Sequence, residues 1–502
     1  MVKVKNMKTK TAIIIGILTL VMCIPTASAL PHMPFVEYPS NPIYGATLGN
    51  GTAYYPCVLK DNNDFSGYGA SSLYKMWYYT GGGTKLVYSA DGIHWSSPAI
   101  NMVNVTNCYH ATVIYEENGF GNGYHYRIDW CTNPGGTIDI SVMKYAWSND
   151  GINWEGTTSL TQSVTNVSMR LCNDSSGYFW QTCGASQIFY NPTATNPGWG
   201  TIDDISDDGS PWEYTWTLVY EPTRNQEHTG LAYSADGTYF IRYGGDYPIL
   251  IANGTGWDAS YSYGLCIVHN ANIWVGLYTG GVDSQYHQGI GFAYSLDGLH
   301  WVKGATNPVM HINDSIPWRS ARTYTPFILR EGDVYEMWYT GQNGADQKNI
   351  GYATFLNLPP NISSQSPANN SKVKRSFQFG ITINDPNGDY IFWTIEANNG
   401  QKTNGISLNG THTINLTGVK KNIKIWVNAS DGIDTVKAYY TYNYKELAKT
   451  NDSTTTNITT NVTTPVHLTG YTNQNYGIAT ILLGIVLFVL GCIFIVGKQR
   501  RR

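Results

Sequence analysis

Four tyrosines occupy the same position of a strand that recurs along the chain, and they are the first residues whose type points to chemistry. They are Tyr54, Tyr109, Tyr263 and Tyr324, and His110 follows the second of them. A phenol combines a flat apolar face with a hydroxyl, which is the combination that a sugar ring needs for stacking and hydrogen bonding. The same rings could instead fill a channel inside the fold. The sequence leaves a ligand platform and a plug equally open.

The elements that position these tyrosines are marked by a seven-residue phrase, S-x-D-G-x-x-W, which recurs four times. It begins at Ser89, Ser148 and Ser295, and a weaker copy at Ser234 ends in Phe240 instead of Trp. Ser and Asp oxygens accept hydrogen bonds from backbone N–H groups one or two residues on, and Gly takes the positive φ of a tight turn. The phrase therefore predicts a hairpin turn of the scaffold, and its Asp residues require no metal.

Strands are predicted around each phrase. An apolar strand precedes it, an aromatic strand such as 74–79 or 335–340 comes before that, and a strand that opens with one of the tyrosines comes earlier still. Alternating apolar runs bounded by Gly, Asn and Asp indicate antiparallel strands. Five such modules within 30–357 predict an all-β fold, a five-bladed β-propeller. We expect the leading segment 35–44 to supply the strand that closes the fifth blade.

A second all-β region is predicted after the repeats, at 358–445. Short strands near 377–383, 390–396, 424–428 and 437–442 are separated by turn sequences. This pattern resembles the immunoglobulin-like or fibronectin-like β-sandwich modules of secreted proteins.

Both ends of the chain carry signals for export and anchoring. Lysines, an apolar run and an Ala-Ser-Ala site make 1–29 a predicted signal peptide. The Thr- and Asn-rich segment 446–475 predicts a solvated stalk, with glycosylation acceptors at Asn451, Asn457 and Asn461. The apolar segment 476–497 predicts one transmembrane helix, and the basic tail 498–502 places that end in the cytoplasm. We expect a single-pass protein of the cell membrane with the bulk of the chain extracellular.

Composition limits the partners. Charged residues make up 13% of the chain and the net charge is −4, so no basic stripe is available for nucleic acid. No C-x-x-C or paired His spacing predicts a metal site, and we expect no cofactor.

Eight cysteines include six outside the predicted signal and membrane segments. Pairing Tyr115 with Tyr124 across a hairpin places Cys108 opposite Cys131, which predicts a cross-strand disulfide. Cys172 with Cys183 is the next expected pair. Cys57 and Cys266 share one register in blades one and four and are interpreted as buried thiols.

A family resemblance rests on three phrases: Y-E-M-W-Y-T-G at 335–341, I-G-F-A-Y-S-L-D-G-L-H-W at 290–301 and N-P-V-M at 307–310. They resemble the five-bladed propeller superfamily of arabinanases, invertases, levansucrases and mannosyl-phosphorylases, over about 35–355. The resemblance implies a pocket at the propeller axis that acts on glycans.

Glycosidic cleavage requires two carboxylates, roughly 5–10 Å apart. The resemblance implies that one of them opens the innermost strand of the first blade, but no carboxylate stands at any of the corresponding openings here. The expected substitutes are Asp258, which precedes the inner strand of blade four, and Glu221 or Glu227 in a loop of blade three. Arg319 and Arg322 are candidate clamps for a sugar carboxylate, sulfate or phosphate.

These observations favour a cell-surface glycan-binding or adhesion protein on a glycosidase-like propeller. The alternative is a membrane-tethered glycoside hydrolase or phosphorylase that uses Asp258 with Glu221 or Glu227. A structural envelope component without a ligand is a third reading.

Overall fold

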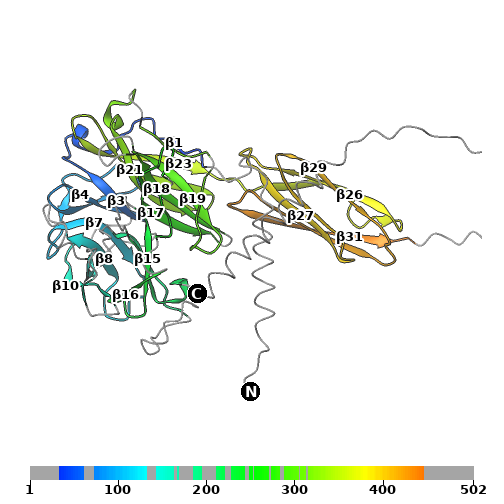
Figure 1. Cartoon of the computed structure of the whole chain (residues 1–502), viewed down its shortest axis with the longest axis horizontal. Helices are drawn as coiled ribbons and strands as arrows, with labels where there is room; N and C mark the ends of the chain where they lie inside the picture. The colour runs from blue at the N-terminus through cyan, green and yellow to red at the C-terminus, as the bar shows by residue number, and fades with distance from the viewer. Residues whose placement is uncertain are drawn as a thin grey trace, which may run out of the picture. The chain divides into compact units, whose positions relative to one another are not determined.

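The structure is a computed structural model of the 502-residue chain (Figure 1). It describes residues 33–60, 73–132, 143–162, 167–168, 185–194, 211–220, 228–243, 248–252, 254–270, 273–282, 288–304, 306–312 and 315–445. The predicted signal peptide, stalk, membrane segment and basic tail lie outside these residues, as do Asn451, Asn457 and Asn461. No helix within the described ranges is long and apolar enough to cross a membrane.

Five groups of antiparallel strands form the blades of a propeller, and those of blades four and five belong to one sheet, joined by a parallel bridge between Gln288 and Arg322. Their strands, given from the inner to the outer edge, are β3 (Tyr54–Lys60), β4 (Tyr74–Tyr79), β5 (Thr84–Ser89) and β6 (Ile100–Asn101) in blade one; β7 (Cys108–Tyr115), β8 (Tyr126–Thr132), β9 (Met143–Ser148) and β10 (Glu155–Ser159) in blade two; β13 (Ala185–Tyr190), β14 (Trp216–Tyr220), β15 (Gly230–Ser234) and β16 (Tyr239–Arg242) in blade three; β17 (Tyr261–Asn270), β18 (Ile273–Gly281), β19 (Gln288–Ser295) and β20 (Val302–Lys303) in blade four; β21 (Arg322–Glu331), β22 (Val334–Gln342), β23 (Lys348–Leu356) and β1 (Val36–Glu37) in blade five. Short strands β11 (Thr161–Gln162) and β12 (Val167–Ser168) extend blade three, and β2 (Tyr44–Gly45) adds to blade five.

The blades close into a ring. The inner strands pack in cyclic order, β3 on β7, then β13, β17 and β21, and β21 packs back on β3 (Figure 1). The leading segment closes the fifth blade, because β1 pairs with β23 through Val36 and Thr354. This confirms the predicted five-bladed architecture and the role of the leading segment.

The repeated phrase forms the predicted turn in all four copies. In the first, Asp91 Oδ1 accepts hydrogen bonds from the backbone N–H groups of Ile93 (2.9 Å) and His94 (2.8 Å), and Ser89 accepts one from Gly92 (3.0 Å). The same bonds recur at the turns that begin with Ser148, Ser234 and Ser295. Gly92 has a φ of 76°, the left-handed region that favours glycine.

Three of the four turns are also held by the preceding blade. Trp338 Nε1 of blade five donates to Gly92 O of blade one (2.8 Å), and Trp77 Nε1 donates to Gly151 O of blade two (3.1 Å). In blade two the donor is Arg127, which donates to Gly237 O of blade three at 2.7 Å. In the fourth turn, Gly298 O instead accepts from Trp301 Nε1 of its own phrase (3.0 Å). In three places the phrase therefore connects one blade to the next through its glycine carbonyl.

Residues 361–444 form two further sheets around a separate core. The first contains β24 (Asn361–Ser366), β26 (Phe377–Asn384) and β29 (Gly410–Leu416); the second contains β25 (Lys372–Val373), β31 (Thr435–Tyr444), β30 (Ile423–Ser430), β27 (Ile391–Ala397) and β28 (Lys402–Ser407). Phe379 and Ile381 of one sheet and Ile395 and Val427 of the other belong to one buried cluster. The region is a β-sandwich, and its kinship to immunoglobulin-like modules stays a prediction.

The expected Cys108–Cys131 disulfide is wrong. Tyr115 pairs with Tyr126, two residues beyond Tyr124, and a bulge shifts the register again, so Cys108 faces Thr132. Cys108 is a free buried thiol, as are Cys57 and Cys266. Cys131 is disulfide-bonded, and its partner lies outside the described residues, as does the expected pair Cys172–Cys183.

Candidate functional site

Four of the inner strands begin with the same backbone distortion. A β-bulge follows Tyr54 in β3, Tyr109 in β7, Tyr263 in β17 and Tyr324 in β21, and the residue after each of these tyrosines has a positive φ. That residue is Tyr55 (54°), His110 (47°), Gly264 (63°) or Thr325 (46°). The left-handed conformation costs a non-glycine residue roughly 1–2 kcal/mol. Bulges of this kind re-aim side chains at barrel rims and active sites, and strained residues cluster at functional sites.

Hydrogen bonds between blades hold these strained residues in place. The backbone N–H of Tyr55 donates to Thr340 Oγ1 of blade five (3.1 Å), and that of Thr325 donates to Thr279 Oγ1 of blade four (2.7 Å). The same device therefore recurs around the axis, and it fixes where the bulged residues point.

The aromatic side chains at this end of the axis form a group that we call the mouth: Tyr54, Tyr55, Tyr79, Tyr109, His110, Tyr263 and Tyr324. Six of these rings contact one another, and Tyr263 is joined to them through Arg322. Tyr55 stacks on His110 with centroids 4.2 Å apart, and its hydroxyl lies 2.7 Å from the hydroxyl of Tyr109. Tyr54 packs against both Tyr55 (5.0 Å) and Tyr79 (5.1 Å). The cluster brings together all four tyrosines of the sequence pattern with His110.

Some tyrosines of the mouth are buried in the channel, and others keep an accessible face that a ligand could contact. Tyr263 and Tyr324 are buried, at 3% and 1% exposed, and they fill the channel. Tyr54, Tyr55 and Tyr109 are only half-buried and keep part of each ring accessible. Burial raises the pKa of Tyr54 and Tyr324 well above the usual value, so both phenols stay neutral at physiological pH.

One arginine lies within this cluster. The guanidinium of Arg322 is 4.1 Å from the ring centroid of Tyr324 and donates to Gln288 Oε1 from Nε (2.9 Å) and Nη2 (2.6 Å). Its Nη2 also lies 3.4 Å from the hydroxyl of Tyr263. Arg322, a candidate clamp, therefore lies beside Tyr263 and Tyr324, and its role toward a ligand stays a prediction.

Asp258, the expected catalytic acid, is buried in blade four and contacts side chains of the same blade. It is 2% exposed, accepts a hydrogen bond from the Tyr278 hydroxyl (3.0 Å) and forms an ion pair with Lys303 on the outer strand β20. Lys303 also donates to Ser262 Oγ at 2.7 Å. This carboxylate is buried and already bound by two side chains of its own blade. Its position therefore gives no support to the prediction that Asp258 acts as a catalytic acid.

Arg319, an expected clamp, occupies the equivalent place in blade five with the charges exchanged. It is 4% exposed and pairs with Glu37 on the outer strand β1, while the Tyr339 hydroxyl donates to Glu37 at 2.9 Å. Arg319 is therefore half of an ion pair within blade five, and its role as a ligand clamp stays a prediction. In blade four the acidic residue precedes the inner strand and the basic residue lies on the outer strand. In blade five the basic residue precedes the inner strand and the acidic residue lies on the outer strand.

Glu221 and Glu227 lie outside the described residues. Among the residues that the structure describes, the carboxylate whose charge acts on Tyr54 and Tyr324 is that of Asp346. Asp346 is 73% exposed and binds Lys348 Nζ at 2.6 Å. No group of three His, Cys, Asp or Glu side chains in the described ranges could hold a metal ion.

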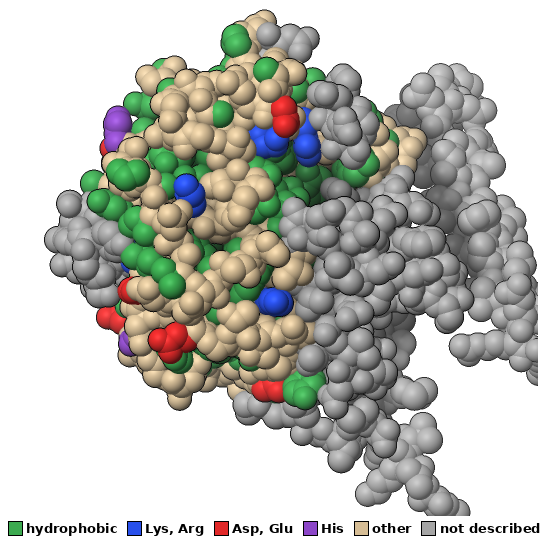
Figure 2. All heavy atoms as spheres, turned by 90° about the vertical axis from the view of Figure 1, so that its left-hand side faces the viewer, with side chains coloured by type: hydrophobic (Ala, Val, Ile, Leu, Met, Phe, Trp, Pro, Cys, Tyr) green, Lys and Arg blue, Asp and Glu red, His purple; other side chains and the backbone are tan. Residues whose placement is uncertain are grey.

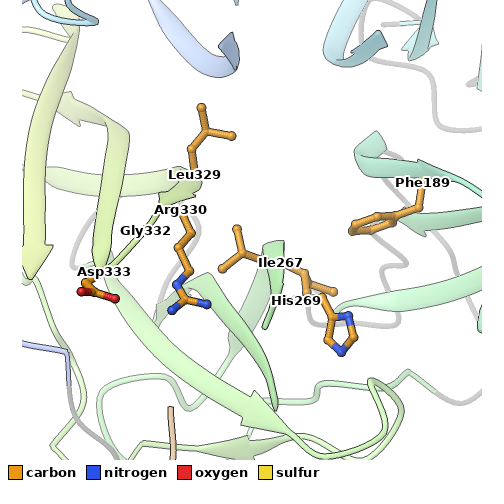
Figure 3. A pocket seen from close by; sticks show the side chains of 8 residues that line it. Phe189, Ile267, His269, Leu329, Arg330, Gly332 and Asp333 are labelled. Atoms are coloured by element: carbon orange, nitrogen blue, oxygen red, sulfur yellow. The ribbon is translucent and has the colours of Figure 1, made fainter. Parts of the chain in front are cut away.

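A second hollow lies where the inner strands of blades three, four and five end, opposite the mouth (Figure 3). Its volume is about 620 Å³, and Phe189, His269, Arg330 and Asp333 are among its lining residues. Its arginine is compensated, because Arg330 Nη2 lies 3.1 Å from Asp434 Oδ1.

One face of the propeller carries few charged side chains among the described residues. On this face, shown in Figure 2, most charged side chains lie singly between polar and hydrophobic ones, and acidic and basic side chains lie together near the top. That face therefore has no broad charged patch that could attract a ligand without specific contacts.

Sequence reasoning missed Tyr55, Gln288 and Lys348. The signal for Tyr55 was Gly264, which occupies the same register in blade four and marks a position that needs a positive φ. Nothing in the local sequence marks Gln288 or Lys348, because their neighbours at the mouth come from other strands.

No protein-family model matches the chain, and no curated protein matches it. Similar solved structures include a glycoside hydrolase (14% identity, 70% of this chain and 96% of that chain covered, TM-score 0.44) and a thermostable family-43 glycoside hydrolase (13%, 63% and 91%, TM-score 0.43). A third is β-1,2-mannobiose phosphorylase from Listeria innocua with β-1,2-mannobiose (12%, 64% and 97%, TM-score 0.41). These are classes of protein that the repeated phrases resemble. With TM-scores below 0.5, the similarities carry no argument here, and the architecture rests on the sheet topology.

Proposed function

We propose that the protein is a cell-surface glycan-binding or adhesion protein whose ligand lies on the phenol cluster of the mouth. The observation that carries this proposal is the half-buried group of Tyr54, Tyr55 and Tyr109 around the axis, held by strained bulges. Aromatic faces with hydroxyls at their edges suit sugar rings, which are apolar on their faces and polar at their rims.

The stored strain supports a functional role for this end of the axis. Gly at all of these positions would avoid the cost, yet Tyr55, His110 and Thr325 adopt the left-handed conformation instead. Three such residues at one register cost roughly 3–6 kcal/mol together. Backbone strain of this size persists where the position of a side chain matters for function, and here the strained residues belong to or lie beside the mouth.

The contacts of Asp258 favour glycan binding over glycoside hydrolysis. The alternative function, a tethered glycoside hydrolase or phosphorylase, relied on this acid, which is occupied by Lys303 and Tyr278. A general acid in glycoside cleavage must reach the glycosidic oxygen.

The rest of the architecture supports display at the cell surface. The proposed order is signal peptide, propeller, immunoglobulin-like sandwich, glycosylated stalk and a single membrane-spanning segment. The sandwich and stalk act as spacers that hold the mouth away from the membrane.

A glycan array probed with the full-length protein, purified in mild detergent, tests the proposal. We expect retention on a subset of glycans, without release of shorter products, and loss of retention in Tyr55→Ala. Tyr439→Ala is the matched control, since this tyrosine lies on the sandwich and is 46% exposed. Retention unchanged in Tyr55→Ala and lost in Tyr439→Ala would move the site away from the propeller. Absence of retention on every glycan would refute the proposal.

A further inference from the structure

Arg322 differs from the other arginines that the structure places in the propeller interior. Arg127 pairs with Asp129, Arg319 pairs with Glu37 and Arg330 pairs with Asp434. In the described part of the chain, the hydrogen-bond partners of Arg322 are instead the neutral groups of Gln288 and Tyr263. Buried or half-buried cations in proteins are normally compensated by a carboxylate, because burial removes them from water.

The Arg322 guanidinium also has N–H donors that no described residue accepts from. An arginine carries five N–H groups in a planar fork. The recorded bonds of Arg322 use Nε and Nη2, and Nη1 has no hydrogen-bond partner among the described residues. Gln288 is 1% exposed and accepts from both Nε and Nη2, so it fixes the plane of the fork from the interior side.

The other charges that the structure describes near the mouth do not offset Arg322. Lys348 Nζ lies 5.3 Å from the ring centroid of Tyr54, and its charge is paired with Asp346. Among the described residues, two cations and one carboxylate therefore leave one positive charge. The Tyr324 hydroxyl is an additional buried polar group without a hydrogen-bond partner in the described residues.

We infer that the ligand of the mouth carries an oxyanion, the carboxylate of a uronic acid or the sulfate ester of a sugar, which pairs with the free edge of Arg322. Planar, two-point recognition of carboxylate and sulfate oxygens is what the arginine fork provides. The sugar ring then lies on the half-buried phenols beside it. This inference rests on the proposed function and specifies the class of glycan.

The experiment is a calorimetric titration of the full-length protein in detergent with three oligosaccharides of equal length: an oligogalacturonate, a sulfated oligosaccharide and a neutral one. We expect one of the two anionic ligands to bind roughly 10- to 100-fold more tightly than the neutral one, as a charge-assisted contact provides. Arg322→Gln should weaken anionic binding far more than neutral binding and so remove that preference. Which anionic ligand binds distinguishes carboxylate from sulfate.

Two further variants keep the result interpretable. Arg322→Lys keeps the charge without the fork and should retain part of the preference. Arg375→Gln, an exposed arginine of the sandwich, is the matched control and should change nothing. The melting temperature should fall less in Arg322→Gln than in Arg127→Gln, because Arg322 loses hydrogen bonds to neutral groups whereas Arg127→Gln leaves the buried carboxylate of Asp129 without its partner.

The outcomes separate the two proposals. Equal binding of neutral and anionic ligands, or an equal loss of both in Arg322→Gln, overturns the anionic specificity while glycan binding stands. Absence of binding to all three, together with an empty glycan array, overturns both. A lower melting temperature in Arg322→Gln with intact anionic preference assigns Arg322 to the scaffold and overturns the inference.

Discussion

The exchanged ion pairs of blades four and five make a prediction that separates structure from catalysis at Asp258. In blade four the acid Asp258 precedes the inner strand and the base Lys303 lies on the outer strand; in blade five Arg319 and Glu37 hold the reverse arrangement. If both pairs only fasten the outer strand to its blade, their polarity is arbitrary. The double variant Asp258→Arg/Lys303→Glu should then fold, whereas either single reversal should be severely unstable.

The magnitude follows from burial. The Asp258 side chain is 3% exposed and that of Lys303 15%, and removing one partner of such a pair costs about 3–5 kcal/mol. Burial lowers the pKa of Lys303 while Asp258 opposes this, so Asp258→Asn leaves the ammonium with burial alone. A domain of about 300 residues has an unfolding entropy near 0.6 kcal/mol per degree, so the melting temperature should fall by about 5–8 °C.

Differential scanning calorimetry of the full-length protein measures these changes. Asp346→Asn is the control, because its carboxylate is 73% exposed, and surface pairs contribute at most about 1 kcal/mol. We expect Asp258→Asn and Glu37→Gln to be destabilised alike, and the charge-exchanged double variant to recover most of the loss. A melting temperature within 1–2 °C of the parent for Asp258→Asn, with loss of an activity on glycans, would refute the structural assignment and restore a catalytic one.

Three more predictions follow from the fold. Alkylation of the unreduced, denatured protein should label Cys57, Cys108 and Cys266 but not Cys131, and labelled Cys131 would contradict this. The native protein should resist labelling, because burial raises the pKa of the three thiols to about 12. Gly264→Ala should destabilise by roughly 1–2 kcal/mol in chemical denaturation, since its φ is 63°, while Gly344→Ala, in open space, should be near neutral; equal effects would count against the left-handed register. Burial raises the pKa of Asp431 to about 6, above its value in the unfolded chain. Its contribution to the free energy of unfolding is therefore full below about pH 4 and is lost as the pH rises through 6, by on the order of 3 kcal/mol. Asp431→Asn should flatten this dependence of stability on pH, and an unchanged dependence would contradict the assignment.

The repeated elements were predictable because they depend on local chemistry. Ser, Asp and Gly in S-x-D-G-x-x-W bond to their own backbone, so the four turns could be predicted from residue types alone. The axial tyrosines were predictable from register, since equivalent positions in a repeat occupy equivalent places in a ring.

The sequence could not predict contacts between residues that are distant along the chain. Asp258 and Arg319 share a register, but their ion-pair partners, Lys303 and Glu37, are 45 and 282 residues away. The Cys108 register depends on a bulge and a turn length that the sequence leaves open.

The most direct test of the account is an experimental structure of the full-length protein with an oligosaccharide selected from the array. The account predicts a sugar ring against Tyr54, Tyr55 and Tyr109, with an oxyanion on Arg322 and no carboxylate at the glycosidic oxygen. A sugar bound elsewhere, such as in the hollow beside Phe189 and His269, or flanked at the mouth by two carboxylates, would contradict it.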